Sequence, residues 1–386
     1  MSIRTIRGFF SIGFDLIVVQ QQMGYDLFVN ASSNPDAQHF VKIFPSGGIL
    51  TEQDVYLFRK KYHRLYVMED QRELYLQTLV RASHVPTNKK AEVVKEIAIE
   101  HLHDLFQIQD ELSNEFLMET ITSCHETVEQ MVNVIEGKNI NEIQDMIGNL
   151  SFHDFYTYDH SINVSMYCIS IYKTVEPKAT HDDLVQIGLA GLLHDLGKMK
   201  IPTEIINKPD KLTDQEFEII QTHPQLGSDI LDEYQPKVTG VDLPTIHRVI
   251  IEHHENFNGS GYPNKLSGEK IHLWARVCAI ADFFDAVTTK RSYAKVLTTD
   301  EAVALMAKSA GNKLDPELFE SFVKNVKKLV MKEFNRELED NFDPSQPHRE
   351  LPFKKLIAKP LGIDIMGKDE KKEKDPKKNK SGKLAS

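Results

Sequence analysis

Residues 184–198 read LVQIGLAGLLHDLGK, an apolar run that ends in a histidine, an aspartate, a glycine and a lysine. The run predicts a strongly apolar helix. An imidazole and a carboxylate embedded among Leu192, Leu193 and Leu196 are costly to bury unless another group satisfies them. A metal ion does this well, so His194 and Asp195 are candidate metal ligands.

The His-Asp dipeptide by itself means little, because it occurs four times in the chain. Only His194-Asp195 follows an apolar helix and precedes a glycine and a lysine. The other three occurrences lie in polar contexts and are interpreted as solvated surface: His103-Asp104, His153-Asp154 and His181-Asp182. The last of these also fits the first turn of a helix that Thr180 opens.

Around this stretch, the pattern from Asn139 to about Asn341 is helix after helix, separated by capping and breaking residues. Thr213 with Glu216 predicts a capping box, and Pro244 fits the first turn of a further helix. Strand-like alternation is nearly absent. We therefore predict an all-α domain over residues 139–345 and a mainly α fold class.

The segment before this domain divides into two parts. Residues 1–88 mix short apolar runs with turn signals, which predicts a small mixed α/β module whose helix is capped by Thr51 and Asp54.

Residues 89–138 are free of proline and predict a connecting helix. Its apolar stripe needs a partner surface, and either a homodimer through this helix or packing onto its own chain would supply one. The stripe comprises Val93, Ile97, Leu102, Leu105, Ile108, Leu112 and Phe116.

Residues 346–386 are rich in lysine and poor in large apolar side chains. This composition predicts a solvated, disordered tail, with weak attraction to an anionic surface as the alternative.

The composition of the whole chain excludes several classes of protein. With 386 residues, 41% hydrophobic and 27% charged, it fits a globular protein of one or two domains, and a net charge of -11 disfavours nucleic-acid binding. The sequence has no run of eighteen apolar residues, so a membrane span is not expected. Asp15 interrupts the apolar run after Arg7, so a signal peptide is not expected.

Three cysteines stand far apart: Cys124, Cys168 and Cys278. They are interpreted as small buried hydrophobes in a reducing cytosol, which predicts a cytoplasmic location.

Five more polar side chains stand beside apolar residues on other predicted helices: His160, His223, His253, His254 and Asp282. Taken singly, each is readily explained as a hydrogen-bonded core residue. Together with His194 and Asp195 they make seven candidate ligands, more than one tetrahedral ion needs, so two ions are the natural number. Nitrogen and carboxylate ligands without thiolate suit Fe, Mn, Zn or Ni.

These residues carry a resemblance to a known family. The series His160, HDLGK at 194–198, His223, HHENFNGSGYP at 253–263 and ADFFDAVTTKRSY at 281–293 resembles the HD-GYP family of the HD phosphohydrolase superfamily. The match covers roughly residues 145 to 340. Residues 1–88 are similar, more loosely, to modules often fused before such domains.

The resemblance implies an all-helical domain that hydrolyses the bacterial second messenger cyclic di-GMP to pGpG and on to GMP. It implies two divalent ions, Fe or Mn first, that activate a hydroxide. One ion would be held by His160, His194 and Asp282, the other by His223, His253 and His254, with Asp195 as the bridge. Asp195 and Lys198 would be catalytic, and Lys198 would also contact a phosphate.

The resemblance also implies substrate-side positions at Asp285 and Arg291. In the glycine-rich loop, Gly259 and Gly261 permit backbone conformations and close approach that other residues would block. Tyr262 is then available to a substrate or to a partner domain.

The chain departs from the family pattern in three places. Tyr156 stands where some members have a glutamate that binds a third metal, so two ions are expected. Asn258 replaces a common aspartate. Ala294 stands where a basic residue is usual, with Lys295 one step later, which could alter substrate preference.

Three functions are therefore in competition. The first is a metal-dependent cyclic di-GMP phosphodiesterase. The second is a catalytically weak receptor that binds cyclic di-GMP or a GGDEF-type partner, and the third is an HD hydrolase of another cyclic dinucleotide. All seven ligand positions carry competent ligand types, which favours an enzyme.

Overall fold

The computed structural model describes residues 5–6, 8–32, 38–83, 85–107, 112–149, 156–208, 211–289, 297–326, 337–338 and 342–344. Arg291, Ala294, Lys295 and the predicted lysine-rich tail lie outside the described residues. Within the described residues, no helix is long and apolar enough to cross a membrane.

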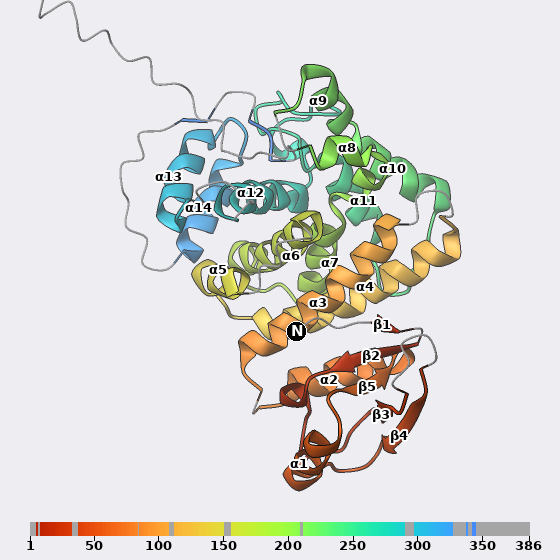
Figure 1. Ribbon diagram of the computed structural model, residues 1–386. Coiled ribbons are helices and arrows are strands. Elements are labelled where there is room, and N and C mark those ends of the chain that lie inside the picture. The colour runs from red at the N-terminus through yellow and green to blue at the C-terminus, as the bar shows by residue number, and fades with distance from the viewer. Residues whose placement is uncertain are drawn as a thin grey trace, which may run out of the picture.

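The N-terminal module is built on a five-stranded antiparallel sheet (Figure 1). Its strands follow the order β1-β2-β5-β3-β4, and β2 pairs with β5 from Phe9 opposite Met68 to Ile12 opposite Leu65. Their bounds are β1 Thr5–Ile6, β2 Phe9–Ile12, β3 Leu27–Asn30, β4 Phe40–Phe44 and β5 Leu65–Met68. The helices are α1 (Glu52–Lys61) and α2 (Arg72–Arg81). The predicted Thr51–Asp54 capping box begins α1, so the mixed α/β prediction is confirmed.

The prediction of a single connecting helix is wrong. The segment forms two helices, α3 (Thr87–Gln107) and α4 (Asn114–Ile135). The second helix has a start signal of its own, because the Ser113 hydroxyl accepts a hydrogen bond from the Phe116 amide at 3.2 Å. The apolar periodicity continues across this break and therefore gave no sign of it.

The apolar stripe of α3 is covered within the chain. Val93, Ile97, Leu102 and Leu105 are buried. The helices α3 and α4 pack on each other and on the two central helices of the domain that follows, α6 (Tyr156–Val175) and α7 (His181–Leu193). Packing of the stripe onto its own chain, the alternative to a homodimer, is thus confirmed for these residues. Ile108 lies outside the described residues.

The rest of the described chain is helical, as predicted, and the fold class is mainly α (Figure 1). The helices besides α6 and α7 are α5 Ile140–Asn149, α8 Thr203–Ile206, α9 Asp214–Ile220, α10 His223–Tyr234, α11 Leu243–Glu252, α12 Leu273–Thr288, α13 Thr299–Met306 and α14 Pro316–Asn325, with a short 3-10 turn, η3, over Leu196–Lys200. The predicted Thr213–Glu216 capping box starts α9, Pro244 lies in the first turn of α11, and Thr180 caps α7.

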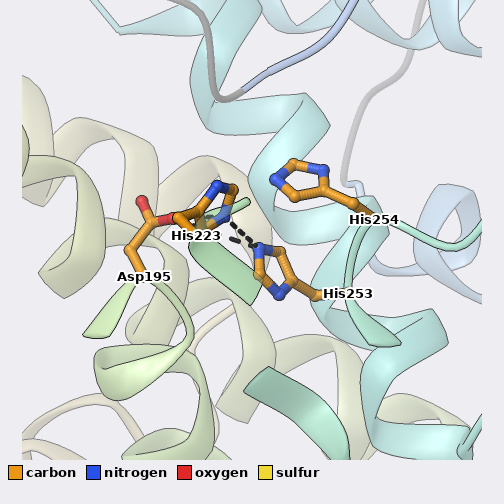
Figure 2. A group of neighbouring side chains, drawn as sticks. All are labelled: Asp195, His223, His253 and His254. Atoms are coloured by element: carbon orange, nitrogen blue, oxygen red, sulfur yellow. Dashed lines mark hydrogen bonds and ion pairs between the residues drawn. The ribbon is translucent and has the colours of Figure 1, made fainter. Parts of the chain in front are cut away.

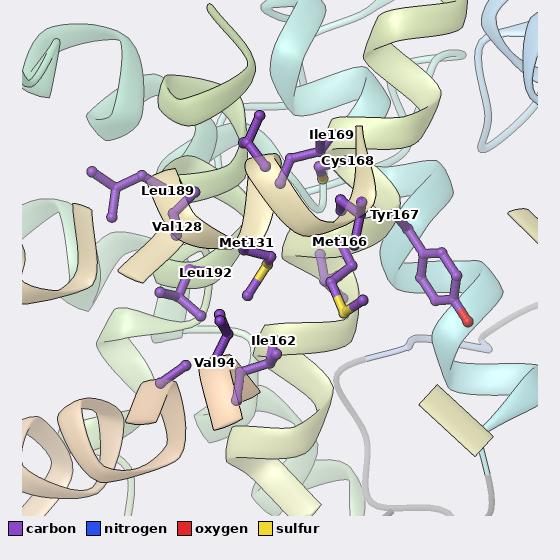
Figure 3. Close-up of a cluster of buried hydrophobic side chains, with 14 of the residues drawn as sticks. Val94, Val128, Met131, Ile162, Met166, Tyr167, Cys168, Ile169, Leu189 and Leu192 are labelled. Atoms are coloured by element: carbon purple, nitrogen blue, oxygen red, sulfur yellow. The ribbon is translucent and has the colours of Figure 1, made fainter. Parts of the chain in front are cut away.

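The core is continuous from the connector into the helical domain. Figure 3 shows Val94 of α3, Val128 and Met131 of α4, Ile162 and Ile169 of α6 and Leu189 of α7 in one cluster of buried side chains. Cys124, Cys168 and Cys278 are buried and unpaired in this interior, in agreement with their interpretation as small hydrophobes. This shared core fixes α6 and α7, the two helices that carry the first candidate ligands.

Candidate metal centre

The seven predicted ligands converge from five parts of the helical domain. His160 is on α6, His194 and Asp195 follow α7, His223 starts α10, His253 and His254 follow α11, and Asp282 is on α12. All seven are buried. Their donor atoms form two groups, each within 4.8 Å: one comprises His160, His194 and Asp282, the other Asp195, His223, His253 and His254.

Asp195 lies between the two groups. Its Oδ2 is 3.3 Å from His194 Nε2 and 3.7 Å from His160 Nε2. Its Oδ1 is 3.2 Å from His223 Nε2 and 4.0 Å from His253 Nε2. One carboxylate therefore faces both groups, and Figure 2 shows it beside the three histidines of the second group.

The donor set fits divalent metal ions. Asp195 Oδ1, Asp282 Oδ1 and His254 Nε2 are buried and have no hydrogen-bond partner among the described residues. Buried polar atoms of this kind are costly unless another group satisfies them. A cation between these atoms would satisfy all three, and imidazole nitrogen with carboxylate oxygen is a typical donor set for Fe, Mn, Zn and Ni.

Four of the histidines are oriented by a contact on the far side of the ring. The Nδ1 atoms of His194, His223 and His253 donate to the carbonyl oxygen three residues earlier, at 2.8, 2.7 and 2.8 Å. His160 Nδ1 lies 2.7 Å from Asp285 Oδ2. Such contacts place the proton on Nδ1 and leave the Nε2 lone pair directed at the centre, as in known metal sites.

Asp285 does not occupy the substrate-side position that the resemblance to HD-GYP proteins implied. It is fully buried behind His160, and its Oδ1 accepts hydrogen bonds from Asn163 at 2.9 Å and Thr289 at 2.6 Å. With its two oxygens held in this way, the carboxylate is a support for His160. The sequence held no local signal of this contact, because His160 and Asp285 are 125 positions apart.

The protonation states of Asp195, His253 and His254 suit metal binding. Burial raises the pKa of Asp195, but the nearby His194 and Lys198 outweigh burial and hold the pKa well below its ordinary value. Burial, followed by neighbouring histidines, holds the pKa values of His253 and His254 well below the ordinary value. Both imidazoles are therefore neutral, and the carboxylate is ionised, at neutral pH.

His160 is different. Burial lowers its pKa, but the neighbouring carboxylates of Asp282 and Asp285, 3.2 and 2.7 Å from its ring nitrogens, outweigh burial and raise the pKa to about 9. A proton therefore competes for this ring at neutral pH, so a cation that binds at its Nε2 would release that proton.

Lys198 is held at the centre by the HDLGK turn. Its Nζ lies 2.6 Å from Asp195 Oδ2, and the side chain is buried. Gly197 makes this turn possible, because a Cβ at this position would overlap the His223 carbonyl oxygen and lie 2.5 Å from the Gly227 amide nitrogen. The glycine therefore lets η3 and α10 touch through their backbones, which brings the two ligand groups together.

Replacing Gly197 with alanine is expected to lower the free energy of unfolding by about 1–3 kcal/mol and to reduce bound metal, because η3 and α10 must move apart. Urea denaturation and elemental analysis would measure the two effects. Gly24→Ala is the matched control, since the nearest atom to its new Cβ would be Leu74 Cβ at 3.5 Å, an ordinary van der Waals contact. A Gly197→Ala protein as stable and as metal-rich as the control would refute this role for the glycine.

The glycine-rich loop folds tightly against the second group. A Cβ at Gly261 would lie 2.5 Å from the His254 carbonyl oxygen, and Gly259 has a φ of +83°. Both findings agree with the predicted need for glycine. The Tyr262 ring stacks on His254 with centroids 5.0 Å apart, and its hydroxyl donates to Asp343 Oδ2 at 2.7 Å. Tyr262 thus supports a candidate ligand, a contact that the sequence did not indicate.

A pocket of about 470 Å³ lies beside this loop. Its walls include Asn258 and Ser260 of the loop, Phe283 next to Asp282, and Phe342 next to Asp343. Lys308 and Asn312 add a cation and an amide from the segment between α13 and α14. Polar groups and aromatic rings together suit a ligand with both a charged and a flat, aromatic part.

Comparison with known proteins finds a family model and relatives that are similar to this part of the chain. The model of an HD domain matches residues 148–318. A cyclic di-GMP phosphodiesterase of Pseudomonas aeruginosa is 44% identical over 46% of this chain and 41% of its own length. A 3'3'-cGAMP-specific phosphodiesterase of Vibrio cholerae is 32% identical over 45% of this chain and 36% of its own length. The chain thus spans less than half the length of these two relatives.

A solved structure shares the fold. An HDG"Y"P protein from Bdellovibrio bacteriovorus superposes with a TM-score of 0.51 over 82% of this chain and 98% of that one, at 16% identity. The fold, the matched domain and the HDLGK and GYP stretches at the converging ligands agree with one another. Residues 148–318 of this chain thus match the HD domain family model, and within them the HDLGK and GYP stretches resemble the HD-GYP type.

Proposed function

We propose that this chain is a metal-dependent phosphodiesterase that hydrolyses cyclic di-GMP to pGpG, to GMP or to both. The observation that carries the proposal is the convergence of six buried ligand side chains around a seventh, the carboxylate of Asp195. A relative named as a cyclic di-GMP phosphodiesterase, 44% identical over the matched part, supports the substrate class.

The proposed cofactor is a pair of divalent ions, Fe or Mn first and Zn or Ni as alternatives. His160, His194 and Asp282 would hold one ion, and His223, His253 and His254 the other, with Asp195 facing both. Such a pair lowers the pKa of a bound water and neutralises the charge of a phosphodiester.

The side chains of the centre supply orientation and charge. Asp285 and three backbone carbonyls fix the directions of four imidazoles, so the donors are arranged before any ligand arrives. Lys198, anchored on Asp195, contributes a cation to a buried site, where it stabilises negative charge on phosphate oxygens better than it would in water. We assign the catalytic roles to Asp195 and Lys198.

A second candidate substrate is 3'3'-cGAMP. The favouring observation is the Vibrio cholerae relative, whose name gives that specificity. The pocket beside the loop is where we expect the two substrates to be distinguished, because it presents Asn258, Ser260 and Asn312 to the edge of a base. Binding of a GGDEF-type partner and formation of a homodimer remain predictions.

One experiment tests the proposed function. The purified chain, loaded with Mn²⁺ or with Fe²⁺ under reducing conditions, is incubated with cyclic di-GMP and in parallel with 3'3'-cGAMP, and the products are followed by chromatography. We expect pGpG or GMP, loss of turnover with a chelator and recovery when metal is restored. A chain that holds about two ions and turns over neither substrate would refute the enzyme and favour a receptor.

A further inference from the structure

His254 differs from the other four histidines of the centre in what lies behind its ring. Each of the others has an acceptor within 2.8 Å of Nδ1. Beside His254 Nδ1 lies the carboxylate of Asp343, with Oδ1 at 3.8 Å. This distance is too long for a direct hydrogen bond, yet it places a negative charge on the side of the ring opposite the unsatisfied Nε2.

Asp343 is fixed in this position by Tyr262. The tyrosine hydroxyl donates to Oδ2 at 2.7 Å, and the tyrosine ring lies on the His254 ring at an interplanar angle of 23°. The three side chains therefore form one unit, in which the carboxylate holds the phenol and the phenol covers the imidazole. Asp343 is itself buried, so its charge acts in a medium of low dielectric.

The neighbouring residue anchors the segment to the helical domain. The Phe342 ring packs on Phe283 of α12 with centroids 5.0 Å apart, and Phe283 directly follows the candidate ligand Asp282. The Lys313 ammonium donates to the Phe342 carbonyl oxygen. These contacts hold residues 342–343 against both the α12 side and the loop side of the centre.

We propose that Asp343 is a positioning residue for His254, so that a segment beyond the matched HD domain completes the second ligand group. The match to the family model ends at residue 318, and Asp343 is 89 positions after His254 in the sequence. The inference rests on the proposed function, because it requires that His254 binds a metal ion.

A carboxylate behind a ligating imidazole strengthens the imidazole as a donor and fixes its direction. Loss of such a partner typically lowers metal affinity by 10–100-fold. Here the loss should fall on the ion held by His223, His253 and His254. The ion held by His160, His194 and Asp282 has its own orienting contacts and should bind as before.

The test uses the full chain with Asp343→Asn, which keeps the size of the side chain and an oxygen that can accept from Tyr262. Metal-free protein is equilibrated with Mn²⁺ at a series of buffered concentrations, and bound metal per chain is measured by mass spectrometry. We expect two ions in the parent protein, and in the variant one ion bound as before and the other about 10–100-fold more weakly. Glu337→Gln is the matched control, since it removes one negative charge from the same terminal region, where Glu337 faces Lys308.

A second variant keeps the inference testable if the first folds poorly. Tyr262→Phe retains the ring on His254 and removes the hydroxyl that holds Asp343, so it should weaken the same ion by a smaller factor. Asp343→Glu should recover part of the affinity that Asp343→Asn loses. Thermal unfolding of the metal-free proteins, which a merely structural role would change, should be similar throughout.

The outcomes separate the inference from the proposed function. Two ions bound as tightly by Asp343→Asn as by the parent chain would overturn the inference alone. Equal weakening of both ions with a lower unfolding temperature would also overturn it, because that pattern marks a structural residue. A parent chain that binds fewer than two ions would refute the proposed dinuclear centre first, and the inference with it.

Discussion

Replacing Asp195 with alanine is expected to abolish hydrolysis and to lower the metal content of the protein. Asp195 is the carboxylate that faces both ligand groups, with oxygen atoms 3.2 Å from His223 Nε2 and 3.3 Å from His194 Nε2. Its loss also leaves the buried Lys198 without the oxygen that lies 2.6 Å away. We expect kcat/KM to fall at least about 10³-fold, which is about 4 kcal/mol of transition-state stabilisation.

The measurement is steady-state hydrolysis together with metal per chain. Asp182→Ala is the matched control, because it alters a second His-Asp dipeptide, His181-Asp182, at the exposed start of α7. It should leave the rate of hydrolysis and the metal content unchanged. An Asp195→Ala protein that remains active and fully metallated would show that the bridging role is misassigned.

The second large effect is a loss of stability where helix α3 of the connector packs on helix α6 of the helical domain. Lys95 of α3 and Asp159 of α6 form an ion pair with Nζ and Oδ1 2.7 Å apart, and their side chains are only 2% and 8% exposed. Removing one partner of such a pair leaves a buried charge and typically costs about 3–5 kcal/mol. We therefore expect Lys95→Met to lower the free energy of unfolding by that amount. The pair is also close to the metal centre, because Asp159 directly precedes His160.

A double-mutant cycle measured by urea denaturation tests this expectation. Lys95→Met with Asp159→Leu should recover most of the lost stability, because an apolar pair often replaces a buried ion pair at little cost. Lys89→Met is the control on the same helix, since its pair with Glu92 is partly exposed and should contribute less than about 1 kcal/mol. A single variant that loses no more than the control, or a double variant no better than the single, would contradict the prediction.

Local signals in the sequence predicted much of the fold. The capping residues Thr51, Thr180 and Thr213 begin helices in the structure because a cap depends only on residues within one turn. The prediction of a single connector helix was wrong, since the apolar periodicity of its stripe continues past Ser113, where a new helix begins.

The candidate ligands were also found from the sequence. Each of the seven is a polar residue beside apolar ones, and burying such a residue demands a partner. The resemblance to HD-GYP proteins then implied the two ligand groups, and the structure brings each group together within 4.8 Å.

Local sequence patterns were enough to predict most of the helices, their caps and the residue types of the candidate metal centre, because these depend on neighbours three or four positions away. Three contacts became visible only in the folded chain: Asp285 behind His160, Lys95 with Asp159, and Asp343 near His254. These contacts join residues 64 to 125 positions apart. Their partners are set by how whole helices pack in a shared core, and no local pattern carries that information.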